Sequence, residues 1–407
     1  MKQVAERMKG MPGFSIDKVA AAAGNDPTVL RLENLDTDLL PPAAALKATR
    51  EAVGDDDSNS YLPFTGRRDL CEALTLHLES QTGHKYDPLT EVVITSGGTE
   101  GIMDSLLAIC NPGDEVVVTD PTYAGMIYRI KMTGAVPKFV PFHLVAQKKA
   151  DGSVSESWRL DLNALKNSVG PKTRAIFIMS PSMPSGALLN MEEWQAVAEL
   201  CIRHDIWLLY NAAMERIIYD GLPYIHPASL PGMAERTITI GSVSKEYRMI
   251  GWRLGWVVGP VEILPSIAQA HIYNVVTPTG LTQTAALAAL RSPLSDLEGA
   301  VREWERRRNA IVAQLQGFPL IPAAGGWSML LDVGKMGYSA VEASELLLEK
   351  GKIAATPMDS WGDVNSTQFI RFVFTNEPVE RLSDMRERLL NALPPKEDSP
   401  YAHLCPN

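Results

Sequence analysis

Short apolar runs alternate with helix-length segments over the first two thirds of the chain. Continuous rather than alternating apolar residues mark seven strand-like runs: EVVITS (91–96), DEVVVTD (114–120), AVPKFVPF (135–142), RAIFIMS (174–180), IWLLYN (206–211), RTITIGS (236–242) and LGWVVGP (254–260). Between them lie helical patterns such as 99–111 and 191–204. Strands that are apolar on both faces, separated by helices, predict an α/β domain with a mainly parallel seven-stranded sheet covered on both sides.

The last third of the chain has a different pattern. From about Leu281 it is helical, with a long charged helix expected around 296–316, followed by the strands GGWSMLLDV and FIRFVF and a closing helix at 378–392. We therefore predict a large domain over 45–280 and a smaller α+β domain formed by 1–44 and 281–407. The polar stretch 146–158 is expected to be an exposed loop or insertion.

Composition and charge narrow the class of protein. The chain has 407 residues, of which 45% are hydrophobic and 21% charged, and its formal net charge is -10. An acidic chain lacks the basic face that nucleic acid or an anionic membrane requires, so neither is an expected partner. The charged N-terminus has no continuous apolar core, and we expect neither a signal peptide nor a membrane span.

Cysteine and histidine usage points to a reducing compartment and to no metal. The four cysteines are far apart and form no C-x-x-C pair, and the seven histidines show no ligand spacing. We therefore predict a cytoplasmic protein without a disulfide framework and without a metal site. The cysteines are Cys71, Cys110, Cys201 and Cys405.

Two strand ends carry candidate chemistry. The run EVVITS leads into GGTEG, which places Gly97, Gly98 and Thr99 at a helix N-terminus, where backbone N–H groups can bind a phosphate. A plain glycine turn with Thr99 as the helix N-cap is the alternative. The stretch SVSKEYRMIGWRLGW places Lys245 and Arg253 in an apolar setting, where a lysine loses proton affinity and becomes a nucleophile. A lysine beside phosphate anchors suits an aldehyde cofactor that carries a phosphate.

The same residues carry a family resemblance. Ser242-Val243-Ser244-Lys245, followed by Gly251-Trp252-Arg253-Leu254-Gly255, resembles the Schiff-base signature of class I/II aminotransferases, which are fold-type I enzymes that use pyridoxal 5'-phosphate (PLP). The resemblance implies that Lys245 carries PLP and that PLP phosphate is held by Ser242, Arg253 and the amides of Gly98 and Thr99.

The resemblance extends from about residue 61 to about residue 371. It implies that Tyr123 in DPTYAG stacks on the cofactor ring, and that Arg371 in FIRFVF binds the substrate α-carboxylate as a bidentate pair. Tyr61 in SYLPFTG matches a tyrosine that reaches the cofactor phosphate of a neighbouring subunit, which implies a homodimer. Taken singly, Tyr123 could be a core aromatic, Tyr61 a turn tyrosine and Arg371 a surface-strand arginine.

Four positions depart from the family pattern, and all concern one pocket. Asn211 replaces the aspartate that pairs with the cofactor's pyridine nitrogen, and Met214 replaces a tyrosine that bonds its phenolic oxygen. Met183 stands where an asparagine serves the same oxygen, and Leu35 stands where a glycine is expected in the segment that covers the substrate. A neutral amide favours the protonated ring less than a carboxylate does, and the methionines make the pocket more apolar.

Three functions therefore stay open from the sequence. The first is an aminotransferase that acts on an amino acid and a 2-oxo acid; the second is a PLP enzyme that performs elimination, replacement, cyclisation or oxidation. The third is a member of the fold that no longer uses PLP. The acidic residues Glu33, Asp36 and Asp38 could receive a cationic substrate side chain or form a solvated turn before Pro41 and Pro42.

Overall fold

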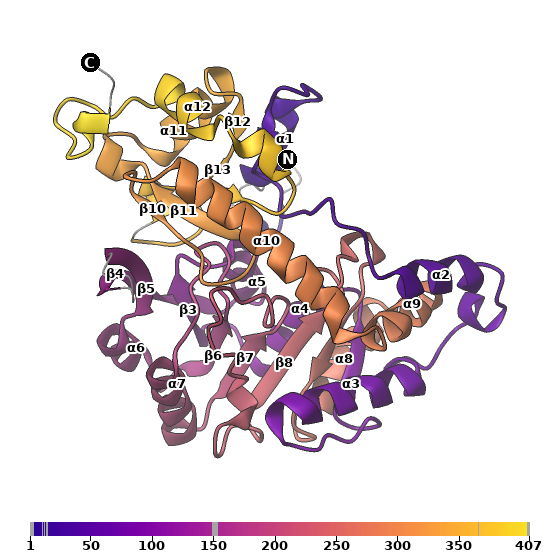
Figure 1. The fold of residues 1–407 in the computed structure, drawn as a ribbon. Helices are drawn as coiled ribbons and strands as arrows, with labels where there is room; N and C mark the ends of the chain where they lie inside the picture. Colours follow the sequence, from indigo (N-terminus) through magenta and orange to yellow (C-terminus); the bar gives the residue numbers. More distant parts are fainter. Residues whose placement is uncertain are drawn as a thin grey trace.

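A large twisted sheet forms the centre of the protein (Figure 1). The structure is a computed structural model that describes residues 4–9, 11, 13, 15–148, 154–364 and 366–404. The sheet has eight strands in the order β2-β9-β8-β7-β6-β3-β4-β5. Their bounds are β2 (Val92–Thr95), β3 (Glu115–Asp120), β4 (Val136–Lys148), β5 (Val154–Leu160), β6 (Thr173–Met179), β7 (Trp207–Asn211), β8 (Thr237–Ser242) and β9 (Gly255–Val258).

The sheet is mainly parallel, as the sequence predicts. Strands β8, β7, β6, β3 and β4 run parallel, whereas β9 is antiparallel to β2 and to β8, and β5 is antiparallel to β4. Every residue of β8 is buried. Since successive side chains point to opposite faces, both faces must be covered.

One edge of the sheet corrects the sequence analysis. All seven predicted runs are strands, but the stretch 146–158 is not a loop over its whole length: β4 continues to Lys148, and Val154–Leu160 forms the eighth strand β5. Residues 149–153 lie outside the described residues. Trp158 and Leu160 are buried while Ser157 and Arg159 are partly exposed, so β5 is an amphipathic edge strand. The sequence analysis missed this strand because the polar residues on its exposed face give the stretch the composition of a loop.

Helices connect and cover the strands. α4 packs on β2, β8 and β9, α5 on β4, and α7 on β6. The predicted helices 99–111 and 191–204 correspond to α4 and α7. The helices around the large sheet are α3 (Arg68–Thr82), α4 (Gly98–Ile109), α5 (Ala124–Met132), α6 (Leu162–Ser168), α7 (Met191–His204), α8 (Leu264–Asn274) and α9 (Gly280–Leu290).

A second, four-stranded antiparallel sheet lies in the C-terminal part, in the order β10-β11-β14-β13. The long charged helix α10 leads into it (Figure 1). The predicted closing helix is shorter than expected, because a 3-10 turn precedes α12. The elements are α10 (Leu294–Gln314), β10 (Leu320–Ile321), β11 (Ser328–Asp332), α11 (Ala340–Glu349), β12 (Ile353–Ala354), β13 (Thr356–Pro357), β14 (Phe369–Val373) and α12 (Met385–Ala392).

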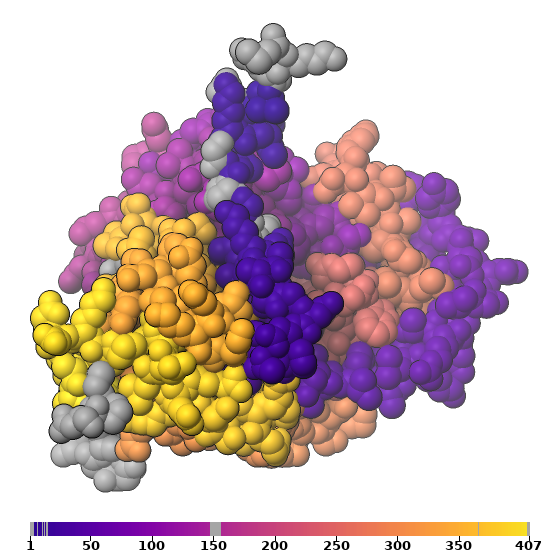
Figure 2. Space-filling view, turned by 90° about the horizontal axis from the view of Figure 1, so that it is seen from above, coloured from indigo at the N-terminus to yellow at the C-terminus, as the bar shows by residue number. Residues whose placement is uncertain are grey.

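The N-terminal residues join the C-terminal part. β1 (Leu30–Arg31) pairs in parallel with β12, and α1 (Ser15–Ala23) packs on β12 and β13. Viewed from above, this indigo segment lies between the yellow and orange C-terminal residues and the magenta and salmon residues of the large sheet's part (Figure 2). Helix α2 (Ala43–Ala52) packs instead on α9. The exact domain boundaries at 45 and 281 stay a prediction.

Short 3-10 helices occur in the connections. They are η1 (Glu6–Met8), η2 (Asp57–Asn59), η3 (Pro227–Ser229), η4 (Ile250–Trp252), η5 (Gly334–Met336), η6 (Ser366–Gln368), η7 (Val379–Leu382) and η8 (Ala402–Leu404). Over the described part of the chain, no helix combines the length and the apolar character needed to span a lipid bilayer.

Candidate active site

A cavity of about 260 Å³ lies where the carboxyl ends of β7 and β8 meet the start of α4. The carboxyl ends of parallel strands share one edge of the sheet, so residues distant in sequence converge there. Its walls include most of the residues that the sequence analysis selected: Leu35, Gly98, Thr99, Tyr123, Met183, Asn211, Met214, Ser242, Lys245 and Arg253. Tyr61 and Arg371 do not line it.

The start of α4 forms a tight cradle. Gly97 is the N-cap residue, with a φ of 82° and no side-chain cap, so the cap is not Thr99. A Cβ on Gly97 would lie 2.7 Å from Nη2 of Arg253, and a Cβ on Gly255 would lie 2.4 Å from the Gly98 nitrogen. Glycines are therefore needed for this approach of Arg253 and β9 to the helix start. Uncapped N–H groups beside a guanidinium are suited to an anion such as phosphate.

Arg253 supplies the positive charge of the cradle. Its Nη1 donates hydrogen bonds to Ser244 Oγ at 3.3 Å and to the Ile250 carbonyl at 3.0 Å. Within the described part of the chain, no carboxylate forms an ion pair with Arg253. Its charge is therefore available to a bound anion.

Lys245 faces the same cavity from the turn after β8. Its Nζ donates a hydrogen bond to the Leu35 carbonyl at 2.8 Å and lies 4.7 Å from the centre of the Trp327 ring. Burial lowers the pKa of Lys245 to about 7; Asp36 acts in the opposite direction, and Arg253 and Arg371 lower the pKa further. A large fraction of the amine is therefore unprotonated, and so nucleophilic, near neutral pH.

The departures from the family pattern lie together in the wall. Asn211 Oδ1 accepts a hydrogen bond from the Ala213 N–H at 3.1 Å, which leaves the amide NH₂ group to meet a ligand. Met183 and Met214 are buried. Among the described residues that line this cavity, none is acidic. The wall therefore offers an N–H donor and apolar surface where the family has a carboxylate and two polar partners.

Arg371, on β14, is fully buried. Its Nη2 donates to the Glu33 carbonyl at 2.5 Å and to Thr356 Oγ1 at 3.2 Å, and its guanidinium lies 4.8 Å from the Trp361 ring centre. Nε and Nη1 have no hydrogen-bond partner among the residues that the structure describes. Burial lowers the pKa of Arg371 to about 9, opposed by Glu33. A surface-strand arginine is therefore the wrong interpretation of this residue.

Tyr61 lies apart from the cavity of its own chain. Its side chain is 84% exposed, in the segment between η2 and α3. An exposed tyrosine suits a residue that reaches a second subunit, and it equally suits a turn tyrosine. Its role stays a prediction.

The acidic residues near the N-terminus are largely committed elsewhere. Glu33 is fully buried and its Oε1 accepts a hydrogen bond from Arg31 Nε at 2.8 Å, so it is no part of a solvated turn. Asp38 pairs with Arg307 at 2.7 Å. Asp36 is exposed, and its Oδ1 accepts a hydrogen bond from the Thr37 N–H at 2.8 Å. A cationic substrate side chain could therefore meet at most Asp36.

A buried cluster beside the cradle was not foreseen. One ligand atom from each of Glu100, Asp104 and His271 lies within 4.8 Å of the others. His271 Nδ1 is 2.7 Å from Glu100 Oε1, and its Nε2 donates to the Phe64 carbonyl at 2.9 Å. Glu100 also accepts a hydrogen bond from the Ser96 N–H. Since both nitrogens of His271 are engaged, the cluster supports the cradle rather than presenting a free ligand set.

The titration of this cluster follows from its burial. Burial and the adjacent Glu100 raise the pKa of Asp104 to about 7. Burial acts to lower the pKa of His271, but its hydrogen bonds to Glu100 and to the Phe64 carbonyl, with the charges of Glu100 and Asp104, together raise it. The i,i+4 spacing of Glu100 and Asp104 directly after the glycines is the only sequence signal; nothing in the sequence links them to His271.

Comparison with known proteins identifies the family. The family model described as aminotransferase class I and II matches residues 28–389. Aromatic-amino-acid aminotransferase 2 of Thermococcus litoralis is 28% identical over 392 residues, covering 95% of this chain and 98% of that protein. Kynurenine–oxoglutarate transaminase 3 of Rattus norvegicus is 30% identical over 375 residues, covering 86% of this chain and 82% of that protein.

A solved structure agrees with this assignment. The structure of N-succinyldiaminopimelate aminotransferase from Mycobacterium tuberculosis superimposes with a TM-score of 0.87 at 28% identity, covering 95% of this chain and 99% of that one. The fold, the lysine after β8 and the glycine cradle thus all agree with the family that the comparisons give. The chain belongs to the class I and II aminotransferases, a family of PLP-dependent enzymes with the fold-type I architecture.

Proposed function

We propose that this protein binds PLP through Lys245 and transfers the amino group of an amino acid to a 2-oxo acid. The observation that carries the proposal is an amine with a pKa of about 7 that lines one cavity together with an uncapped helix start and Arg253, which forms no ion pair with a described carboxylate. PLP, when bound, supplies an aldehyde that condenses with amines and a ring that withdraws electrons from the carbon bearing the amine.

The residues of the cavity fit this cofactor. The cradle, which a Cβ on Gly97 or Gly255 would obstruct, would hold the phosphate with Arg253 and Ser242. The partly buried ring of Tyr123 lies on the same wall and would cover one face of the cofactor ring. Near neutral pH the Lys245 amine can accept and return a proton, which suits it to move a proton at the substrate's α-carbon.

Arg371 would bind the substrate. Its Nε and Nη1 are buried without a partner, and buried N–H groups in this state favour a carboxylate ligand. Trp361 covers one face of the guanidinium and keeps it desolvated. A carboxylate that accepts a hydrogen bond from one of these nitrogens would fix the α-carbon relative to Lys245.

Oligomeric state and compartment belong to the same proposal. The proposal includes a homodimer in which Tyr61 of each chain completes its neighbour's phosphate site, an arrangement with which the exposure of Tyr61 is compatible. Cys71, Cys110 and Cys201 are free thiols, which supports a cytoplasmic location.

A second candidate rests on Asn211. Because its Oδ1 is bonded to the Ala213 N–H, the side chain presents a donor to the cavity, and a donor favours an unprotonated ring nitrogen. That weakens the electron withdrawal on which amino-group transfer depends, and it motivates elimination, replacement, cyclisation or oxidation as the alternative reactions. A protein without PLP is the weakest candidate, because Lys245 and the cradle are both present.

The primary test is cofactor attachment. The purified protein should show visible absorbance with PLP that borohydride abolishes, and mass spectrometry should place the reduced cofactor on Lys245. Lys245→Ala should remove both signals and amino-group transfer, whereas Lys172→Ala, at an exposed lysine, should retain them. Attachment at another lysine, or full activity of Lys245→Ala, would show the assignment to be wrong.

A further inference from the structure

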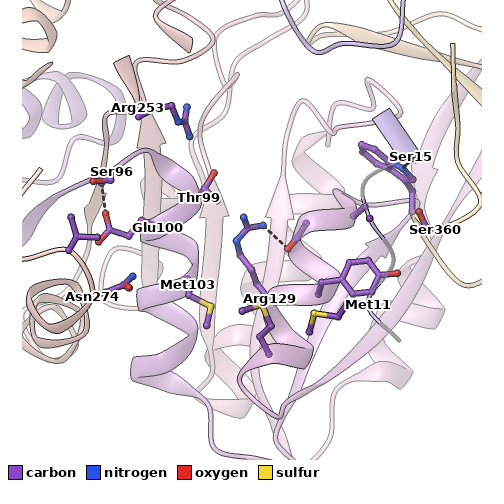
Figure 3. Close-up of a pocket in the computed structure, with 17 residues that line it drawn as sticks. Met11, Ser15, Ser96, Thr99, Glu100, Met103, Arg129, Arg253, Asn274 and Ser360 are labelled. Carbon is purple, nitrogen blue, oxygen red and sulfur yellow. Dashed lines mark hydrogen bonds between the residues drawn. The ribbon is translucent and has the colours of Figure 1, made fainter. Parts of the chain in front are cut away.

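A second cavity adjoins the first. It has a volume of about 470 Å³, lies between α4, α5 and residues 360–361, and shares Thr99 and Arg253 with the cofactor cavity (Figure 3). Apolar side chains, among them Met103 and Met132, form much of its wall. Its volume is in the range of small-molecule sites, so a ligand group could extend from the cofactor cavity into it.

Arg129 on α5 is the charged group that points into this space (Figure 3). Its Nη1 donates to the Gly125 carbonyl at 2.7 Å, and its guanidinium lies 5.7 Å from the Tyr123 ring centre. A Cβ on Gly125 would lie 2.5 Å from both Arg129 Nη1 and Tyr123 Cζ, so glycine makes room for this arrangement. No described carboxylate pairs with Arg129, and most of its N–H groups remain available.

The other charged groups of the wall are already committed. Glu100 accepts a hydrogen bond from the Ser96 N–H, which Figure 3 shows, and it also contacts His271. Arg253 belongs to the phosphate cradle. The remaining polar groups, including Asn274 and Ser360, are neutral. Among the described residues of its wall, the cavity therefore offers a ligand one uncommitted cation, set in largely apolar surroundings, which favours an anionic group.

We propose that Arg129 binds an acidic group at the far end of the substrate's side chain and so selects long acidic amino acids. The inference rests on the proposed function: Arg371 takes the α-carboxylate and Arg129 the distal one. Trp361 links the two sites, because its ring lies against the Arg371 guanidinium and also lines the second cavity. The apolar wall in between suits a methylene chain.

Binding of unreactive acids tests this without turnover. Adipate and hexanoate have equal length and differ by one carboxylate. Isothermal titration of the PLP-loaded protein should show tighter binding of adipate, and Arg129→Gln should reduce that preference roughly ten- to a hundredfold. Arg302→Gln, at an exposed arginine on α10, removes the same charge and should retain the wild-type preference. Arg129→Glu should shift the preference toward 6-aminohexanoate.

The outcomes separate this inference from the proposed function. An unchanged adipate preference in Arg129→Gln overturns it. The inference is also overturned if Arg129→Gln loses the adipate preference only because it no longer dimerises. Arg129 would then contact a second chain rather than the ligand. Adipate binding that depends on Arg129, without amino-group transfer, would refute the proposed function and support this inference. If the protein transfers amino groups and Arg129→Gln impairs transfer from acidic and from neutral amino acids equally, the proposed function is supported and this inference is refuted.

Discussion

Replacing Lys245 by methionine should stabilise the cofactor-free protein. The pKa of Lys245 is lowered, chiefly by burial, from 10.5 to about 7. At about 1.36 kcal/mol per pH unit, this difference means that the buried charged amine destabilises the folded state by roughly 5 kcal/mol. Contact with solvent and the bond to the Leu35 carbonyl reduce the figure. We therefore expect a gain of about 2 kcal/mol for Lys245→Met at pH 7.

The sign of the pH dependence follows from proton binding. Between pH 7 and 10.5 the folded protein binds fewer protons at Lys245 than the unfolded chain does. The unfolding free energy of the wild type therefore rises with pH across this window, and the advantage of Lys245→Met shrinks toward zero at its upper end. All other titrating groups are common to both proteins and cancel in the difference.

Urea denaturation at pH 7 and at pH 10 measures the effect. PLP must be removed first, because a ligand bound only to the folded wild type would stabilise it and reverse the comparison. Lys172→Met, at an exposed lysine, is the matched control and should be neutral at both pH values. A variant less stable than the wild type at pH 7, or an advantage of equal size at both pH values, would refute burial as the cause of the lowered pKa.

Three further changes test the site. Asn211→Asp keeps an acceptor for the Ala213 N–H and adds a negative charge. In an aminotransferase, the formation of pyridoxamine phosphate, measured by stopped flow, should accelerate roughly tenfold. In an enzyme adapted to another reaction, the native product should form more slowly. Mixing Tyr61→Phe chains with Lys245→Ala chains should raise activity above the mean of the two separate variants; an active monomer would exclude shared sites. Gly255→Ala places a Cβ 2.4 Å from the Gly98 nitrogen, so β9 and the start of α4 must move apart and PLP affinity by equilibrium dialysis should fall at least roughly tenfold. Circular dichroism checks that the variant retains its secondary structure.

The sequence was most informative where local chemistry decides structure. Continuous apolar runs predicted the seven strands because buried parallel strands need apolar residues on both faces. Lys245 and Arg253 were recognisable because short-range spacing places them around one strand end. The edge strand β5 was missed, because an edge strand with one exposed face has the composition of a loop. Thr99 was a plausible cap, but Gly97 takes that position through its positive φ.

The sequence by itself determined the α/β class and the family, and it selected most of the residues that line the cavity at the ends of β7 and β8, since these depend on periodicity and on motifs of adjacent residues. Only the tertiary structure decided which charges remain unpaired. Arg371 is buried, although taken singly it could have been a surface-strand arginine, whereas Tyr61 is exposed. His271 meets Glu100 across 171 positions of sequence, and Arg129 faces a cavity that distant elements enclose. Burial and pairing set pKa values and ligand preference, and both depend on neighbours that chain folding alone brings together.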